Sequence, residues 1–234
     1  MNKYLFFFLF FVSNTILLYS QTRVDYLATF DEKKIHYGMY LGLNQTDYKF
    51  RYRSGMNDPL QYEDDVRNIF VKQEPGFNVG LIVDFRLQKN FNFRVEPGLI
   101  TNAKTLIFYN INEEERALEN TFLHVPFVLK YSADRIRNIR PYVLGGISLD
   151  YNFTSNENGG DNTEGQFRMK TANFMYEVGV GIDIYLYFFK FSPSIRGVFA
   201  INNELIRDKN SPSPYTDPIG FMGTRGVFLN FAFE

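Results

Sequence analysis

Apolar and polar residues alternate strictly through two neighbouring stretches of the chain, residues 77–87 and 91–99. A polar tripeptide, residues 88–90, separates them. Alternation with a period of two is typical of a β-strand whose faces meet different surroundings, and two such stretches joined by a short turn predict a β-hairpin. The apolar face packs either on a soluble core or against membrane lipid. The polar face carries the charged side chains Asp84, Arg86, Arg94 and Glu96.

The same alternation recurs along the rest of the chain and predicts eight strands in total. After residue 45 the pattern changes phase, and Tyr48, Phe50 and Tyr52 alternate with charged neighbours. This change indicates either a bulge or a strand that continues beyond the membrane. The second hairpin strand is expected to continue to about residue 109. The six further strands are expected at residues 36–45, 121–131, 141–153, 172–186, 190–203 and 221–233.

The connections between these strands alternate in length. Short turns are expected at residues 88–90, 133–140 and 187–189. Short turns on one side and long loops on the other are typical of outer-membrane barrels, and an even strand number places both termini on the periplasmic side. After residue 20, no apolar run is long enough for a membrane helix. The long polar connections are expected at residues 54–75, 110–120, 154–170 and 204–218.

The predicted fold class is all-β, an eight-stranded antiparallel up-and-down transmembrane β-barrel with a closed, side-chain-filled lumen, over residues 36–234. The alternative is a soluble lipocalin-like barrel, which would place the apolar face inside. The polar faces are rich in glycine and small residues, as a narrow lumen requires, and the apolar faces are rich in Phe and Tyr. These features favour the membrane barrel.

Composition agrees with that fold. The 234 residues include 26 Phe and 16 Tyr but no Trp, while 22% of residues are charged. Many aromatic residues without an apolar overall composition suit a barrel, in which only every second side chain faces lipid. A net charge of −1 gives no electrostatic attraction to nucleic acid. The absence of cysteine excludes disulfide scaffolds, thiolate zinc sites and cysteine nucleophiles.

The N-terminus has the features of a secretory signal peptide. Lys3 supplies positive charge, an apolar run occupies residues 4–12, and a polar tripeptide interrupts it. We expect residues 1–20 to be removed by cleavage after Ser20. An uncleaved anchor is the alternative, but the apolar run is short for a membrane span. Residues 21–35 are polar without a clear period, and a periplasmic leader is expected there.

The predicted strands place several charges in the lumen. Eight strands enclose a space that side chains fill, so opposite charges should pair into a network instead of lining a water channel. A buried charge left unpaired costs several kcal/mol, on the order of 3–5. Filling the lumen is therefore the favoured role for these residues. The predicted inward charges are Asp84, Arg86, Arg94, Glu96, Lys130, Asp150, Glu177, Asp183 and Arg196.

The candidate chemistry is sparse. Some small outer-membrane barrels modify lipids with serine, histidine and a carboxylate, and this chain has two histidines. His36 is expected at the periplasmic rim, and His124 near the loop end of its strand, facing the lumen. No serine can be placed beside either of them from sequence. We assign no catalytic and no cofactor-binding residue, and expect no cofactor.

Metal and nucleotide sites are also not expected. No cysteine and no spaced histidine pair is present for a zinc site. The acidic loops lack the spacing of a calcium-binding EF-hand, although calcium binding by these loops stays open. The glycines of Gly179-Val180-Gly181 lie on a predicted strand with no helix after it, which differs from a nucleotide-binding loop.

Six segments together resemble the PorT family of outer-membrane β-barrels. Residues 190–205 are particularly similar to PorT itself, which is called SprT in gliding bacteria. The resemblance covers nearly the whole chain after residue 20, and it carries over no catalytic or ligand residue. The segments are residues 77–81 (FNVGL), 92–98 (NFRVEPG), 122–131 (FLHVPFVLKY), 140–146 (RPYVLGG), 176–183 (YEVGVGID) and 190–205 (KFSPSIRGVFAINNEL).

The resemblance implies an accessory role in type IX protein secretion and, where present, gliding motility. We therefore expect a non-enzymatic barrel in the Gram-negative outer membrane that acts as an accessory or assembly component. Its expected partners are outer-membrane lipid and other secretion components, with no nucleic acid and no small-molecule substrate. One alternative is a surface barrel whose long loops bind extracellular ligands. A lipid-modifying enzyme is the other.

Overall fold

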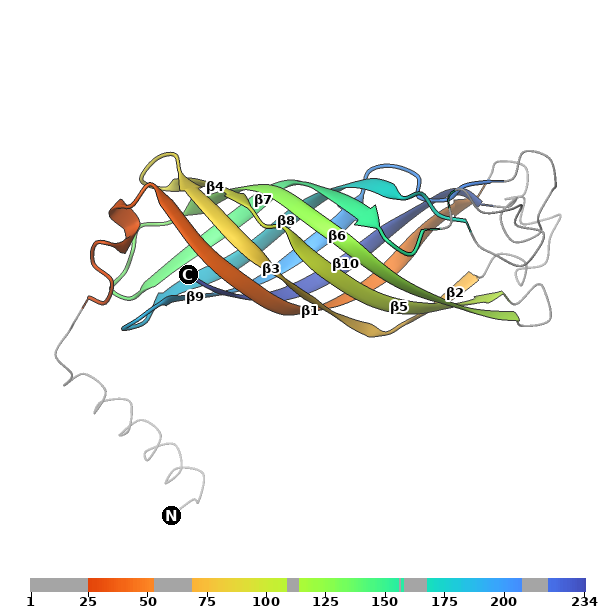
Figure 1. Cartoon of the computed structure of the whole chain (residues 1–234), viewed down its shortest axis with the longest axis horizontal. Helices are drawn as coiled ribbons and strands as arrows, with labels where there is room; N and C mark the ends of the chain where they lie inside the picture. The colour runs from red at the N-terminus through yellow and green to blue at the C-terminus, as the bar shows by residue number, and fades with distance from the viewer. Residues whose placement is uncertain (1–24, 53–68, 109–113, 156, 158–167, 208–218) are drawn as a thin grey trace, which may run out of the picture.

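The computed structural model of the chain describes residues 25–52, 69–108, 114–155, 157, 168–207 and 219–234. Ten strand segments form one continuous sheet, which curls into an elongated barrel (Figure 1). A short 3-10 helix, η2 (Phe30–Glu32), precedes the barrel at one end. The strands are β1 (Ile35–Tyr52), β2 (Ile69–Gln73), β3 (Pro75–Arg86), β4 (Phe91–Val95), β5 (Gly98–Phe108), β6 (Glu114–Ser132), β7 (Ile139–Asn152), β8 (Ala172–Tyr185), β9 (Lys190–Ala200) and β10 (Ile219–Phe233).

The ten segments make eight strands that cross the barrel. Glu74 alone separates β2 from β3, and Glu96 and Pro97 alone separate β4 from β5. Proline has no N–H to donate to a sheet ladder, which explains the second break. The carbonyl of Pro97 still accepts the N–H of Leu81 at 2.9 Å, so the pairing across the break continues.

The barrel is closed by hydrogen bonding. β1 pairs antiparallel with β10 on one side and with β3 on the other, and every further neighbouring pair is antiparallel. The first and last strands of the barrel are thus joined through β1, although the short β2 pairs only with β5; a closed sheet is the arrangement that lets strands cross a membrane with their backbone groups satisfied. The predicted eight-stranded antiparallel barrel is therefore confirmed.

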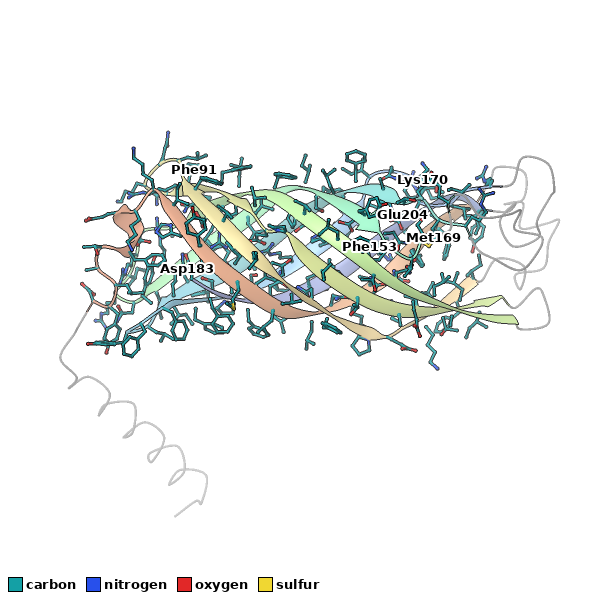
Figure 2. All side chains as sticks on the ribbon, viewed as in Figure 1. Phe91, Phe153, Met169, Lys170, Asp183 and Glu204 are labelled. Carbon is teal, nitrogen blue, oxygen red and sulfur yellow. The ribbon has the colours of Figure 1, made fainter. Side chains whose placement is uncertain are left out.

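Side chains alternate between the lumen and the outside as predicted. On β1 the side chain of Leu41 points outward and is 52% exposed, whereas that of Asn44 points inward and is 2% exposed. The apolar face lies outside and the polar face inside, which is the reverse of a lipocalin-like barrel. Aromatic residues lie near both ends of the apolar band, with Phe91 near one end and Phe153 near the other (Figure 2).

The strands are longer than predicted at the end away from η2. β1 continues to Tyr52 without a change of face, β6 begins at Glu114 instead of residue 121, and β2 lies inside an expected connection. The change of pattern after residue 45 is a change in which face is apolar, while the side chains keep their directions. In this outer section Tyr48 points inward and is 3% exposed, while Lys49 is exposed, because the wall has left the apolar band and now has water outside.

An apolar cluster fills the lumen of this outer section. Two segments expected to be loops contribute to it, because Met169 and Leu205 form a β-bridge and turn inward. The N–H of Lys170 donates to the carbonyl of Glu204 at 2.9 Å. Figure 2 labels Met169 and Glu204 near the end opposite η2. The buried members of this cluster, here called the outer cap, are Tyr48, Leu106, Met169, Leu205, Ile219 and Met222.

At the η2 end the strands are joined by short turns at residues 87–90, 133–138 and 186–189, as predicted. Within the described part of the chain, no helix has the length and apolar character to cross a membrane. The predicted signal peptide, residues 1–20, lies outside the described residues. The leader is described from Asp25 onward.

Candidate functional site: the closed lumen

A network of buried charges crosses the lumen. Asp84 on β3 and Arg94 on β4 are register partners, and the Nε–H of Arg94 donates to Asp84 Oδ2 at 2.5 Å. The same guanidinium donates to Glu96 at 3.4 Å and to the C-terminal residue Glu234. One arginine therefore joins three carboxylates: Asp84 on β3, Glu96 directly after β4, and Glu234 directly after β10. All four side chains are buried.

Glu96 connects this group to a second arginine. The guanidinium of Arg196 on β9 donates to both carboxylate oxygens of Glu96, at 2.5 and 3.1 Å. Its Nη1 also lies 3.8 Å from a carboxylate oxygen of Glu177 on β8. A bidentate pairing of this kind holds both side chains in one geometry.

A second group of charges lies nearer η2. The ammonium of Lys130 on β6 donates to both oxygens of Asp183 on β8, at 2.8 and 2.7 Å. Ser192 on β9 donates to the same carboxylate at 2.6 Å. Lys190 Nζ lies 2.9 Å from Glu234, which links this group to Arg94. Four strands are thus tied together through the lumen.

His124 sits within the network instead of at its edge. Its Nδ1 lies 2.5 Å from Asp150 Oδ1, and its Nε2 lies 3.0 Å from Glu177 Oε1. Both ring nitrogens face carboxylates, so neither is placed to accept a proton from a serine, as a catalytic triad requires. The prediction that His124 faces the lumen is confirmed. Its expected position near the loop end is wrong, because β6 begins at Glu114 and His124 is central in the strand.

His36 lies at the rim near η2, as predicted. Its Nε2 is 2.7 Å from the carbonyl oxygen of Phe30, and its ring stacks on the Phe30 ring with centroids 4.3 Å apart. Lys190 Nζ lies 4.7 Å from the centroid of the same Phe30 ring. These contacts hold the leader against the barrel and give His36 a structural role.

The leader covers the mouth of the lumen at this end. The hydroxyl of Tyr185 donates to both carboxylate oxygens of Asp31, at 2.7 and 2.9 Å, and Arg86 donates to the Asp31 carbonyl. Arg140 Nη1 lies 3.6 Å from the Asp31 carboxylate. The cavity behind Asp31 has a volume of about 10 Å³, which is room for about one water molecule. The mouth is therefore sealed by an acidic side chain among cations.

The other end of the network is sealed by apolar side chains. Phe122, Met175 and Phe228 belong to a buried layer that lies across the lumen with Ile100 and Val198. Beyond it, Lys104 Nζ lies 3.8 Å from the centroid of the Tyr48 ring. In the outer cap, Glu204 accepts the N–H and the hydroxyl of Thr224 at 2.7 and 2.8 Å. Burial raises the pKa of the Glu204 carboxyl above its usual range.

The structure brings the predicted inward charges together, with one exception. Arg86 lies at the mouth beside Asp31 and is only half-buried. Sequence reasoning missed Lys190, Glu234, Lys104 and Glu204, all of which are buried. The inward direction of Lys190 could have been predicted, because it is in phase with the inward Ser192 and Ser194. The described residues contain no group of three or more His, Asp or Glu side chains that could hold a metal ion.

Comparison with known proteins gives one family. The family described as outer membrane protein beta-barrel domain matches residues 19–205 of the chain. No curated protein sequence matches the chain significantly.

Several solved structures are similar in overall form. The outer membrane protein OprG from Pseudomonas aeruginosa is 13% identical, with a TM-score of 0.48 over 85% of this chain and 93% of that one. Neisserial surface protein A is 8% identical, with a TM-score of 0.44 over 86% and 98%. The outer membrane protein AlkL, solved in lipid bilayers, is 13% identical, with a TM-score of 0.46 over 92% and 94%.

Proposed function

Because the chain belongs to the outer membrane protein beta-barrel domain family, we propose that it is a non-conducting barrel that supports type IX protein secretion as an accessory or assembly component. The protein lies in the Gram-negative outer membrane, where its apolar outer face meets lipid. The finer part of the proposal, the secretion role, rests on the resemblance of its sequence to the PorT family.

One observation carries the non-conducting part of the proposal. The lumen is blocked in series by the leader at Asp31, by the ion pairs of Arg94 and Arg196, and by the layer that contains Phe228. A polypeptide or a hydrated solute could pass only if these contacts broke together. Breaking one buried ion pair costs on the order of 3–5 kcal/mol, so opening the whole series would approach the stability of a domain. The surfaces left for its function are therefore the outer wall and the two ends of the barrel.

The segment most similar to PorT, residues 190–205, supports the proposal through the contacts that it makes in the lumen. It supplies Lys190 and Arg196 to the lumen network and Glu204 and Leu205 to the outer cap. A resemblance in this segment is therefore a resemblance in how the barrel is closed. It is consistent with a barrel that contributes surfaces instead of a channel.

Two experiments test the proposal. The purified barrel in a planar bilayer should show no steady conductance, and a stable open level would contradict the closed lumen. Deleting the gene should abolish export of type IX cargo, and export should return with the wild-type gene. Normal export in the deletion strain would reject the secretion role.

The same deletion strain separates the alternatives. A changed lipid A mass would favour a lipid-modifying enzyme, although His124 lies between two buried carboxylates and away from lipid. Lost adhesion with normal export would favour a surface barrel that binds extracellular ligands.

A further inference from the structure

A hollow of about 590 Å³ lies on the outer wall of the barrel, where β1, β8, β9 and β10 pass from the apolar band to the outer section. Aromatic and cationic side chains line it together. Its main lining residues are Lys49 and Arg51 from β1, Tyr176 from β8, Phe199 from β9, and Phe221 and Arg225 from β10.

Two outward-facing glycines explain why the wall is hollow here. A Cβ on Gly223 would lie 2.8 Å from the Phe221 ring, and a Cβ on Gly197 would lie 2.9 Å from the Phe199 ring. Each phenylalanine has therefore folded down over a glycine of its own strand. Tyr176 stacks on Phe199, with ring centroids 5.1 Å apart. The floor is aromatic and flat instead of being filled by projecting side chains.

Cations form the rim of the hollow on the side away from η2. In the β1–β10 pairing, Lys49 lies opposite Gly223 and Arg51 opposite Phe221. Arg51 lies over the Phe221 ring, 4.9 Å from its centroid. Arg225 donates to Asp47 at 2.7 and 3.1 Å, so one of the three cations has a carboxylate partner. Within the described part of the chain, Lys49 makes no ion pair within 4 Å, which leaves the rim with an excess positive charge.

The position of the cationic rim along β1 indicates which layer of the membrane surrounds it. Along β1 the outward side chains change from Leu41 and Leu43 to Lys49 and Arg51, which marks the upper limit of the apolar band. The short turns, the start of β1 and the end of β10 lie on the other side, and that side is periplasmic in outer-membrane barrels. The rim therefore stands at the headgroup level of the outer leaflet.

The hollow continues downward along the lipid-facing wall. A second hollow of about 250 Å³ shares Phe199 and Arg225 with the first and adds Val227, and the polar side chains of Gln45, Asp47 and Gln73 also line it. A third, of about 500 Å³, shares Val227 and extends along Val178 and Ile195 toward the membrane centre. Cations above and an apolar wall that includes Val178, Ile195 and Val227 below match an anionic headgroup with an acyl chain.

We propose that this groove binds a phosphorylated glycolipid of the outer leaflet. The phosphate lies between Lys49, Arg51 and Arg225, and an acyl chain follows the path over Phe199 to Val227. An acidic protein segment would meet only the rim and leave the apolar path empty. Free phosphate would do the same. The proposal is independent of the secretion role, because binding is measured on the purified barrel.

The test compares charge variants by native mass spectrometry of barrels extracted in mild detergent, with purified lipid A as the probe. Lys49→Gln with Arg51→Gln removes two cations and keeps the Arg225–Asp47 pair. A cation at an anionic lipid surface contributes about fivefold in affinity, so retention should fall about 25-fold. The matched control, Lys72→Gln with Arg137→Gln, removes two exposed cations elsewhere and should retain lipid as the wild type does.

A second variant tests the acyl path. Val227 is outward and half-exposed, so Val227→Trp should obstruct the path below the rim without altering the cations. Loss of lipid A binding in this variant, together with weak binding of dephosphorylated lipid to the wild type, would support the proposal. Wild-type lipid retention by the double glutamine variant would overturn it. Displacement of lipid A by equimolar inorganic pyrophosphate would also overturn it, because the acyl chain would then contribute nothing.

Discussion

Arg94 and Asp84 lie directly opposite each other on β4 and β3, and their side chains meet in the lumen with no exposed surface. The same guanidinium also contacts Glu96 and Glu234. Three carboxylates in the lumen thus depend on one cation, with Arg196 and Lys190 supporting them from β9. This relationship makes Arg94 the residue whose loss should be felt most.

Arg94→Leu should destabilise the barrel by about 3–5 kcal/mol, because it leaves Asp84 and Glu234 buried without their main counter-charge. Urea unfolding in detergent, followed by the difference in gel mobility between heated and unheated protein, measures the change. Lys89→Ala is the control. Its ion pair with Asp134 is exposed, so the loss of stability should be far smaller than that of Arg94→Leu. Equal losses in the two variants would contradict the central role of Arg94.

The ring of Tyr40 lies against two glycines of the lumen wall, and this contact can be tested by adding one methyl group. A Cβ on Gly98 would lie 2.2 Å from the Tyr40 hydroxyl and 2.7 Å from the carbonyl of Val79. Gly98→Ala should therefore cost about 1–3 kcal/mol in unfolding free energy. Gly145→Ala is the matched control, since the nearest atom to its Cβ would be 3.6 Å away.

A double variant separates the two clashes at Gly98. Tyr40→Phe removes the hydroxyl, so Gly98→Ala should cost less in that background than alone. The remaining cost should come from the backbone carbonyl of Val79. An undiminished cost would mean that the Tyr40 hydroxyl does not limit the space at Gly98.

The membrane-spanning part of the barrel was predictable because its physics is a pattern of period two. Residues 77–87 and 91–99 alternate cleanly, and this alternation predicted which charges face inward, including Asp84 and Arg94. In a barrel of eight strands, inward charges have to pair. The network therefore followed from the pattern, but its individual pairs did not. Nothing local in the sequence links Glu96 to Arg196, which are 100 residues apart.

The two ends were less predictable, because there the rule relating polarity to direction changes. Above the apolar band, water lies outside and the outer cap lies inside, so Tyr48 points inward although Tyr37 points outward. Met169 and Leu205 belong to stretches whose composition is typical of loops, yet they bridge and close the lumen. Asp31 is one charge in a polar leader, and only its contacts with Tyr185 and Arg140 distinguish it.

His124 should be structural, and a pair of substitutions tests this. His124→Gln leaves Asp150 and Glu177 without a shared partner and should cost about 2–5 kcal/mol of stability. With Asp150→Asn already present, the same change should cost less, because one of the two carboxylates no longer needs compensation. Lipid A from cells that carry the single variant should have an unchanged mass. A lipid A product that disappears with His124 would assign it to catalysis.

The seal formed by Asp31 can be tested with a cysteine reagent, since the natural chain has no cysteine. Ser132 is 2% exposed and lines the cavity behind Asp31. A Ser132→Cys variant should react slowly with a bulky, charged maleimide. Adding Asp31→Ala removes the carboxylate that Tyr185 and Arg140 hold, so the leader should lift more often and labelling should accelerate by about tenfold or more.

The control for reagent and access is Asp134→Cys, at an exposed position on the same end, which should react fast in both backgrounds. Heat-modifiability on a gel checks that each variant still forms a barrel. Fast labelling of Ser132→Cys with Asp31 intact would mean that the leader does not seal the mouth. Slow labelling in both backgrounds would assign the seal to Phe30, whose ring is held between His36 and Lys190 independently of the carboxylate.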